Sequence, residues 1–367
     1  LNASDTVFNP YTQSPGASEC VMGWRGLAPL ALNPNYGYAE GQELYEPPSA
    51  VAAIHWTHFD DLVNFFGVGA DGYAQNYWDN VGVQYGLSAV AAGDITPEEF
   101  LRLNHVIGGW KPEPDMVQEG SPFYPPGVID LSNWDPWSAR NQVFSADPSV
   151  PAPRREGDIA AMNAAYESGL VFRGDIDIPI IDWRHYLEEH LDMHNSHQSF
   201  ASRQRIRDFR GDSDNQVIWF TDVDAGPEFD QTPEAFEVMD EWMTNILEHP
   251  ELGVAANKPE RAVDRCFGAD GEEIAAGEDV WGGILDDGAL GTCAAMFPVY
   301  GTSRIVAGGP FKGSIFKCHL KPVAQAIADG DYGVWTPDPT EQFMLHQIFP
   351  DGVCDFSLPD VGLPAGW

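Results

Sequence analysis

The most regular pattern of apolar and polar positions lies between residues 158 and 248. Apolar runs of strand type cover residues 176–182 and 215–220. Helical patterns cover residues 159–168 and 196–209, so helices and strands alternate along the chain. This alternation is typical of a parallel sheet covered by helices, and we therefore predict an α/β fold.

A further helix is predicted to begin at Thr232-Pro233-Glu234, where threonine can cap and proline suits the first turn. Apolar residues recur along it at three- and four-residue spacing, which predicts one buried face. The residues expected on that face are Phe236, Met239, Met243 and Ile246.

The first 157 residues predict a helical, loop-rich region resembling a lid. Helices are expected at residues 55–66 and 81–92. A third helix has a clear start in Thr96-Pro97-Glu98-Glu99, with the spacing of a capping box, and Gly108-Gly109 is expected to end it. Nine prolines crowd residues 110–157, so we expect a long ordered loop without regular elements there.

Three regions are therefore expected: a lid-like region at residues 1–157, an α/β core segment at 158–248, and a loop-rich tail at 249–367. Four of the five cysteines fall in or next to the tail, and they form no zinc-binding spacing. We predict the sequence-near disulfides Cys266–Cys293 and Cys318–Cys354, and with them a secreted or periplasmic location. Cys20 is left over, which predicts a bond outside the chain.

Charge narrows the classes of partner. Nineteen Lys and Arg stand against 56 Asp and Glu, a net charge of −37, which disfavours nucleic-acid binding. No apolar run approaches the roughly 20 residues of a membrane-spanning helix. We expect no organic cofactor. Two acidic stretches would suit calcium: Asp222, Asp224, Glu228 and Asp230 form one, and Asp270-Gly271-Glu272-Glu273 the other. Neither stretch matches an EF-hand, so solvated surface is the preferred interpretation of both.

The densest polar cluster covers residues 182–197, where the first strand is expected to end, and it holds four of the ten histidines. Ligands bind beyond the carboxyl ends of strands in open α/β sheets, so this is the predicted site. His190, His194 and His197 would share one side of a continuous helix, which allows a metal-dependent hydrolase. Against that alternative, Leu191 follows His190 where zinc hydrolases of this spacing have glutamate.

The chain contains no Gly-x-Ser-x-Gly nucleophile elbow. Ser88 and Ser303 lack both the closing glycine and a preceding apolar strand, so both are interpreted as structural. No serine nucleophile is therefore predicted in this chain.

Several blocks, in order, resemble a known family. They are residues 79–87 (Asp-Asn-Val-Gly-Val-Gln-Tyr-Gly-Leu), 103–109, 192–203, 215–219, 307–310, 317–322 and 349–355. Together they resemble the tannase-like family of unknown function in the α/β-hydrolase superfamily, over roughly residues 70–367. The resemblance implies the C-terminal part of a hydrolase-type parallel sheet, with a lid insertion and a disulfide-held tail.

The resemblance further implies an exported serine hydrolase that cleaves small or polymeric esters, with its serine elbow in an N-terminal half. We therefore expect a companion polypeptide that carries the nucleophile, and a sheet edge at residues 176–181 or 215–220 that continues into it. The start of the chain shows no signal peptide and is interpreted as processed or truncated.

Asp192 matches the family's acid position, and His194 is the best remaining general base, because no histidine follows residues 215–220 until His249. Asp182 and Arg184 are expected to hold this segment or a substrate carboxylate. Trp110 and Trp134 suit an aromatic or sugar group of the substrate, or equally a small core of the loop itself. A non-catalytic binding or structural subunit is the second alternative to the esterase.

Overall fold

The computed structural model describes residues 58–112, 115, 142–186, 188, 195–222, 229, 231–286 and 288–367, together with two short paired strands, β1 (Phe8–Asn9) and β2 (Ser14–Pro15). The chain divides into two compact units. Unit 1 consists of Leu1–Val7 and Phe172–Tyr300, and unit 2 of Phe8–Val171 and Gly301–Trp367. Cys20, His190, Asp192, His194 and Trp134 lie outside the described residues.

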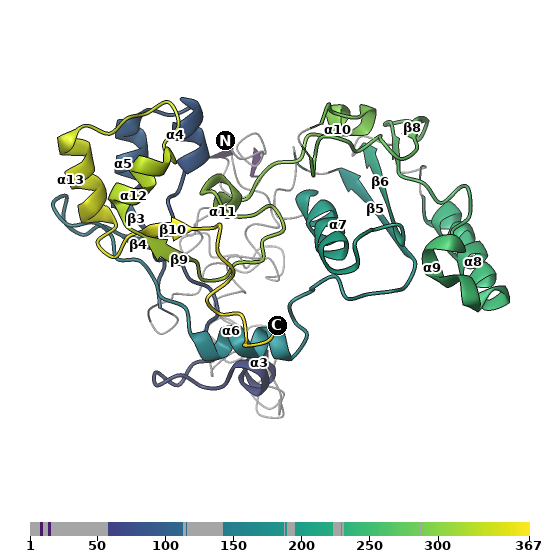
Figure 1. Ribbon diagram of the computed structural model, residues 1–367, viewed down its shortest axis with the longest axis horizontal. Coiled ribbons are helices and arrows are strands. Elements are labelled where there is room, and N and C mark those ends of the chain that lie inside the picture. The colour runs from purple at the N-terminus through teal and green to yellow at the C-terminus, as the bar shows by residue number, and fades with distance from the viewer. Residues whose placement is uncertain are drawn as a thin grey trace. The chain divides into compact units, whose positions relative to one another are not determined.

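Unit 1 is built on a mixed sheet in the order β5-β6-β7-β8, of which β5, β6 and β8 are labelled in Figure 1. Its strands are β5 (Ile180–Tyr186), β6 (Gln216–Asp222), β7 (Arg265–Phe267) and β8 (Glu273–Ala276). The first three run parallel and β8 runs antiparallel. Helix α7 (His197–Arg210) connects β5 to β6, and α8 (Thr232–Glu248), η7 (Pro250–Leu252) and α9 (Gly253–Ala256) connect β6 to β7. The predicted strand–helix alternation is confirmed.

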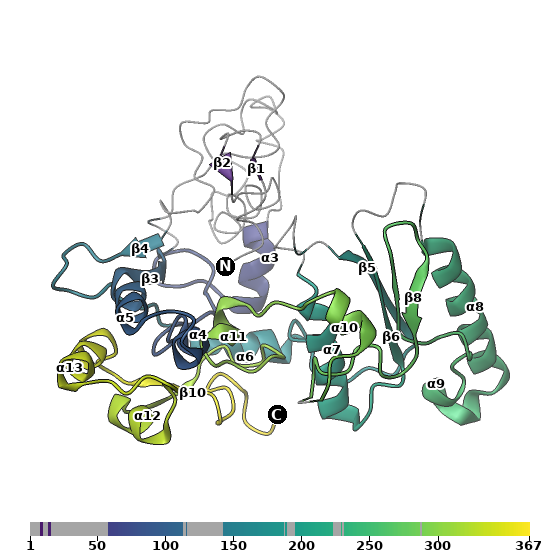
Figure 2. The ribbon, with the colours of Figure 1, turned by 90° about the horizontal axis from the view of Figure 1, so that it is seen from above.

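The central strand β6 is apolar on both faces, as expected for a strand covered twice. Val217 and Trp219 pack with Ala235, Val238 and Trp242 of α8. The alternate residue Phe220 contacts Phe200 of α7 and two further rings, Trp281 and Phe297. Figure 2 accordingly shows α7 and α8 on opposite sides of β5 and β6.

The expected limits of β5 are wrong. The strand was predicted at residues 176–182 and is found at Ile180–Tyr186. Pro179 has no N–H to contribute, and the ladder begins where Ile180 N–H donates to Asn215 O at 2.8 Å. The polar side chains from Asp182 to Tyr186 therefore lie within the strand, and not after it.

The expected face of α8 is wrong as well. Phe236 is 72 % exposed and Met243 is also exposed, whereas Ala235, Val238 and Trp242 are buried and Met239 and Ile246 pack at their margin. Trp242 determines which face of α8 is buried, because its large ring packs under the sheet. Its Nε1 donates a 2.9 Å hydrogen bond to the backbone oxygen of Val254. The helix begins at Thr232 as the first helical residue, and Gln231 at the N-cap makes no side-chain cap.

Unit 2 is assembled from short elements. Its helices are α3 (His58–Phe66), α4 (Leu87–Ala92), α5 (Pro97–Val106), α6 (Ile159–Glu167), α11 (Ser303–Val306), α12 (Val323–Asp329) and α13 (Pro339–Ile348). Strands β3 (Ile107–Trp110) and β4 (Gln142–Phe144) form one antiparallel pair, and β9 (His319–Lys321) and β10 (Val353–Asp355) another. Phe100 of α5 packs with Tyr332 and Trp335 near α12 and α13.

Several local expectations in unit 2 are confirmed and others corrected. Thr96 and Glu99 form the predicted capping box, with Pro97 at the first helical position. The helix expected at residues 81–92 begins only at Leu87, because Gly82 and Gly86 take positive φ angles of 77° and 82°. Helix α5 ends at Val106, and strand β3 follows it directly at residues 107–110. Strand β4 lies within the proline-rich stretch, where no element was expected.

Both predicted disulfides are present. Cys266–Cys293 joins β7 to α10 (Thr292–Met296), and Cys318–Cys354 joins the start of β9 to β10. Each pair lies within one unit. Among the described residues, no helix combines the length and apolar character that a bilayer crossing requires.

Candidate functional site

The three parallel strands of unit 1 end at the same edge of the sheet. β5 ends at Tyr186, β6 at Asp222 and β7 at Phe267. In open α/β sheets, ligands bind beyond this edge. The chain leaves β5 there and returns at α7, and the intervening segment, residues 187–194, contains Asp192 and His194. The carboxyl edge of unit 1 is therefore the candidate site.

Asp182 and Arg184 lie on the face of β5 that α7 covers, two residues apart. The Nε of Arg184 lies 3.6 Å from Oδ1 of Asp182, and its guanidinium lies 6.0 Å from the ring centre of Phe220. The Nη1 of Arg184 donates a 2.9 Å hydrogen bond to the backbone oxygen of Asn195. Arg184 thus ties the backbone at Asn195, two residues before α7, to strand β5.

A second contact joins Glu188, two residues after β5, to Ser196, the residue before α7. Glu188 is only 3 % exposed, and its Oε1 accepts hydrogen bonds from both the N–H and the Oγ of Ser196, the latter at 2.6 Å. A carboxylate buried this deeply needs such partners. The hydroxyl of Ser196 is therefore bonded to a carboxylate, and this contact joins Glu188 to the residue before α7. Sequence reasoning missed this Glu188–Ser196 clamp.

His197 is the first residue of α7 and is buried. Its Nδ1 lies 2.5 Å from Oδ1 of Asn195. Burial, and then the positive charges of Arg184 and Arg205, lower the pKa of His197. The imidazole is consequently neutral at neutral pH. Asn195 orients it, an arrangement that sequence reasoning did not identify.

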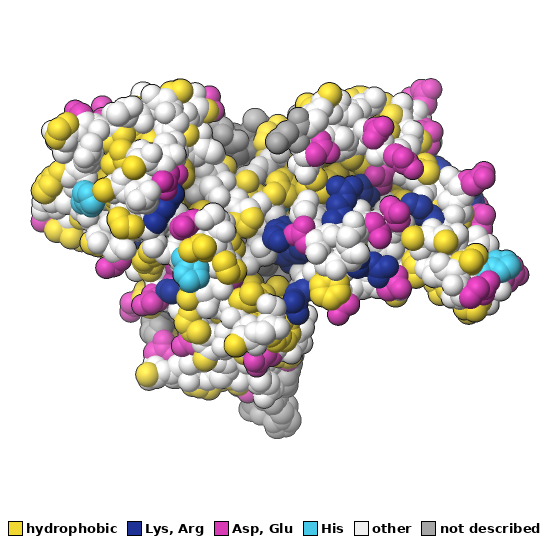
Figure 3. Space-filling view, viewed as in Figure 1, with side chains coloured by type: hydrophobic (Ala, Val, Ile, Leu, Met, Phe, Trp, Pro, Cys, Tyr) yellow, Lys and Arg dark blue, Asp and Glu magenta, His cyan; other side chains and the backbone are white. Residues whose placement is uncertain are grey.

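The positive charge that acts on His197 comes first from Arg184 of β5 and then from Arg205 of α7. The helix carries Arg203, Arg205, Arg207 and Arg210. Figure 3 shows Lys and Arg side chains gathered over α7, with acidic side chains spread around them. Two of these arginines are ion-paired, Arg203 with Asp264 and Arg210 with Asp177.

The structure tests the metal alternative only in part. His190 and His194 lie outside the described residues, and His197 contacts Asn195. Within the described part of the chain, no three His, Cys, Asp or Glu side chains gather as a metal-binding group. Of the two acidic stretches, Asp270 accepts the N–H of Glu272 in a turn, and Asp222 ends β6.

The tryptophans expected to bind substrate belong to the other unit or fall outside the described residues. Trp110 is the half-buried last residue of β3 in unit 2, paired with Gln142 of β4. Trp134 lies outside the described residues. A role for either in substrate binding stays a prediction.

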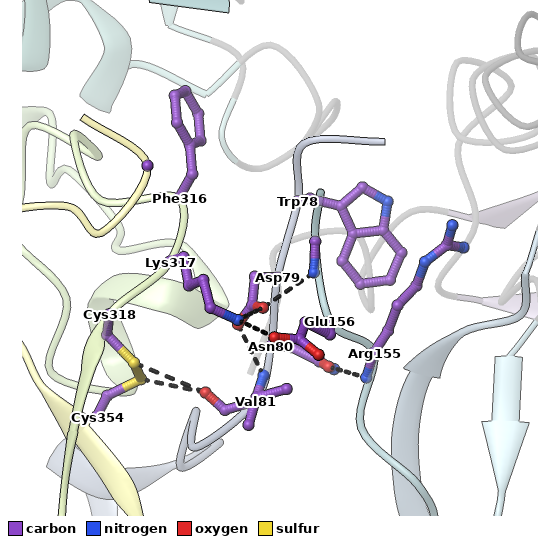
Figure 4. Close-up of polar contacts among 12 residues, drawn as sticks. Trp78, Asp79, Asn80, Val81, Arg155, Glu156, Phe316, Lys317, Cys318 and Cys354 are labelled. Atoms are coloured by element: carbon purple, nitrogen blue, oxygen red, sulfur yellow. Dashed lines mark hydrogen bonds and ion pairs between the residues drawn. A yellow bond between two sulfur atoms is a disulfide. The ribbon is translucent and has the colours of Figure 1, made fainter. Parts of the chain in front are cut away.

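The sequence blocks of unit 2 meet around one buried carboxylate, shown in Figure 4. Asp79 is 2 % exposed and accepts hydrogen bonds from the N–H groups of Val81 and Gly157. Lys317 donates to Asp79 at 2.8 Å and to Glu156 at 2.9 Å. Partial burial lowers the pKa of Lys317, but the two carboxylates outweigh burial and raise it above its ordinary value.

Two further cross-links complete this cluster. The guanidinium of Arg304 donates to the backbone oxygens of Asp79, Ile315 and Phe316. Both sulfurs of the Cys318–Cys354 disulfide lie 3.6 Å from the backbone oxygen of Val81. The side chains of the 79–87 and 317–322 blocks thus bind backbone and one another. These side chains therefore stabilise unit 2, and they are not part of the candidate site on unit 1.

Comparison with known proteins adds one finding. The model of a family described as a tannase-like family of unknown function matches residues 16–365. This match includes all the blocks from Asp79 to Asp355, and it begins well before the first of them. No curated protein and no solved structure matches the chain. The fold itself is mixed α/β with two disulfides.

Proposed function

The chain belongs to the tannase-like family of unknown function, and we propose that it is part of a secreted serine-type ester hydrolase. In this proposal the segment from Asp182 to His197 supplies the acid/base groups, and the proline-rich stretch of residues 110–157 serves as a lid. The nucleophile lies on an N-terminal half outside these 367 residues, either in a larger protein or on a companion polypeptide, because these residues contain no Gly-x-Ser-x-Gly elbow.

The observation that supports this proposal best is the pair of contacts that hold Asn195 and Ser196, the two residues that follow segment 187–194 in the sequence. Arg184 holds the backbone at Asn195, and Glu188 holds Ser196. Both contacts lie next to the carboxyl end of β5, where catalytic groups of α/β sheets gather. A general base must lie within hydrogen-bond reach of the proton that it takes, so the proposal requires His194 to reach this edge of the sheet.

In the proposed mechanism, His194 accepts the proton of the companion's serine as that serine attacks the ester carbonyl. The same imidazolium then donates a proton to the departing alcohol. Asp192 supports the positive charge of the imidazolium. Asp182 and Arg184 keep the segment in position, and Arg184 also provides charge for a substrate carboxylate.

The aromatic side chains Trp110 and Trp134 would contact a phenolic or sugar group of the ester. This assignment follows the likeness to tannases that the family's description states. Secretion is supported by Cys266–Cys293 and Cys318–Cys354, since such bonds persist in oxidising compartments.

The experiment combines the chain with a polypeptide that carries the oxyanion loop and Gly-rich serine elbow of a tannase. Hydrolysis of p-nitrophenyl acetate and of a gallate ester is measured for each polypeptide alone and for the mixture. We expect turnover from the mixture only. Turnover by the companion alone, unchanged when the chain is added, would instead identify the chain as a non-catalytic subunit.

A further inference from the structure

A cavity in unit 2 lies between residues 150–154 and the end of α13. Its volume is about 320 Å³, which falls within the range of roughly 300 to 1,000 Å³ that is usual for small-ligand sites. The described residues that line it are mostly apolar, and the ionisable side chains among them are those of Arg154 and Asp351. Every lining residue belongs to unit 2, so the cavity shares no residue with the candidate site on unit 1.

The guanidinium of Arg154 is fixed by three residues. Its Nη2 donates to the Oδ1 of Asn104 at 3.0 Å and to the backbone oxygen of Asn104 at 3.3 Å. It lies 4.7 Å from the ring centre of Tyr85 and 5.5 Å from that of Phe349. Asn104 is itself fully buried, and its amide nitrogen donates to the backbone oxygens of Tyr85 and Phe100. The cation is therefore in place before any ligand arrives, which lowers the cost of binding.

This cation has no negative partner within the described part of the chain. Its Nε and Nη1 are buried and accept no hydrogen-bond partner from the protein, and its Nη2 bonds only to the neutral Asn104. Burial lowers the pKa of Arg154. A buried charge normally has a counter-ion or a partner for each of its donors, so an anion is missing here.

Other buried arginines of the chain are compensated by the protein. Arg203 forms a two-point pair with Asp264 at 2.6 and 2.7 Å. Arg304 donates to three backbone oxygens. The sequence contains 56 Asp and Glu, yet none that the structure describes pairs with Arg154. Arg154 differs from the others in lining a cavity that an anion from outside can enter.

The walls of the cavity restrict the kind of anion. Val81, Val150 and Phe349 surround the charge with apolar surface. A hydrated inorganic anion gains nothing from such walls and loses its own hydration there. A carboxylate accepts charge-assisted hydrogen bonds from a guanidinium, and an apolar body attached to it buries surface against the walls.

We infer that this cavity binds a small carboxylate with an apolar body, whose carboxylate lies against Arg154 and whose body lies against Val81 and Phe349. The exposed carboxylate of Asp351 also lines the cavity, and its charge opposes that of the ligand. A ligand with a single negative group is therefore favoured over one with two. The cavity lies within unit 2 alone, so it binds its ligand whether or not the chain takes part in ester hydrolysis.

The test measures binding of benzoate to the full chain by isothermal titration calorimetry at pH 7. Benzyl alcohol keeps the ring without the charge, and acetate keeps the charge without the ring. We expect one benzoate site, with benzyl alcohol and acetate each bound at least about 10-fold more weakly, because each lacks one of the two interactions. Absence of benzoate binding, or equal affinity for either control compound, would overturn the inference.

A matched pair of variants tests the cation. Arg154→Met should weaken benzoate binding about 10- to 100-fold, the usual effect of losing a charge-assisted hydrogen bond. Arg155→Met removes the same charge from the next residue, which does not line the cavity, and should leave affinity unchanged. Equal losses in the two variants would show that overall charge, and not Arg154, sets the affinity. Near-ultraviolet circular dichroism verifies that both variants have folded.

A second pair does not depend on the contacts that Arg154 makes inside unit 2. Val150 lines the cavity and is 57 % exposed, so its replacement leaves the fold intact. Val150→Glu should bind benzoate about 5-fold more weakly than Val150→Gln, because the two differ by one like charge at the cavity. Asp351→Asn should raise affinity about 2- to 5-fold for the same reason. Equal affinities in all three variants and the wild type would place the benzoate site elsewhere.

Arg184 provides the control for the candidate site on unit 1, where a substrate carboxylate is proposed to bind. Arg184→Met should leave benzoate affinity unchanged, since Arg184 does not line the cavity. Loss of benzoate binding in Arg184→Met, with binding retained in Arg154→Met and Val150→Glu, would move the carboxylate site to unit 1. That result would overturn the inference and leave the proposed function standing.

Discussion

Arg203 of α7 and Asp264, the residue before β7, form a two-point ion pair at 2.6 and 2.7 Å inside unit 1. Asp264 also accepts the N–H of Ile218 in β6 at 2.7 Å. The side chains are only 6 % and 10 % exposed. This pair therefore connects the helix, the central strand and the next strand of the sheet that supports the candidate site.

Replacing one partner of this pair should destabilise unit 1 strongly. Arg203→Met leaves the carboxylate of Asp264 buried without its cation, which costs about 3–5 kcal/mol. Urea unfolding followed by tryptophan fluorescence reports on this unit through Trp219 and Trp242. Arg207→Met, on the exposed side of the same helix, is the control and should change stability by less than about 0.5 kcal/mol. Equal stability of the two variants would show that the pair contributes nothing.

The Lys317 cluster predicts a loss of stability in alkali. The carboxylates of Asp79 and Glu156 raise the pKa of Lys317 in the folded chain above the unfolded value of about 10.4. The stabilisation is therefore complete below that pH and is lost as pH rises through the folded pKa. Thermal unfolding from pH 8 to 12 should show this decline.

Lys321 is the matched comparison, because Asp331 and Asp329 raise its pKa in the same way. Lys317→Met and Lys321→Met should each remove part of the alkaline decline. Lys317→Met should also lower stability at pH 8, since the carboxylate of Asp79 is almost fully buried. An unchanged alkaline profile in both variants would contradict this assignment.

His197 predicts the opposite dependence, in acid. Burial and the charges of Arg184 and Arg205 lower its pKa below the unfolded value of about 6.5. The unfolded chain then binds a proton that the folded chain does not, so stability is lost as pH falls below about 6.5. Thermal unfolding of the wild type and of His197→Gln between pH 5 and 8 measures this. The variant should have the flatter profile, and a parallel decline in both would exclude His197 as its source.

Ester turnover by the two-polypeptide mixture should depend on His194 above the other histidines of the segment. His194→Ala should lower kcat by about 100- to 10,000-fold, the usual contribution of a general base. His190→Ala and His197→Gln should cost far less, and chelation with EDTA should leave turnover unchanged. Equal losses in all three variants, reversed by added zinc, would favour the metal-dependent alternative.

Local features of unit 1 and unit 2 were predictable because they depend on neighbouring residues. The capping box at Thr96 and Glu99 and the start of α6 after Asp158 each require only side chains within three residues of the backbone that they cap. The alternation of strands and helices follows from the spacing of apolar residues. Both disulfides join cysteines that are close in sequence, so pairing each cysteine with its sequence neighbour was enough to predict them.

The sequence by itself thus determined the alternation of strands and helices in unit 1, both disulfides and the family. Only the tertiary structure decided which residues of β5 pair, because the hydrogen bond from Ile180 to Asn215 depends on a partner 35 residues away. The buried face of α8 was decided by the fit of Trp242 beneath the sheet, which hydrophobic spacing alone does not specify. The contacts of Arg184, Glu188 and His197 form only once the chain has turned back from β5 into α7, because a hydrogen bond requires both of its atoms in place.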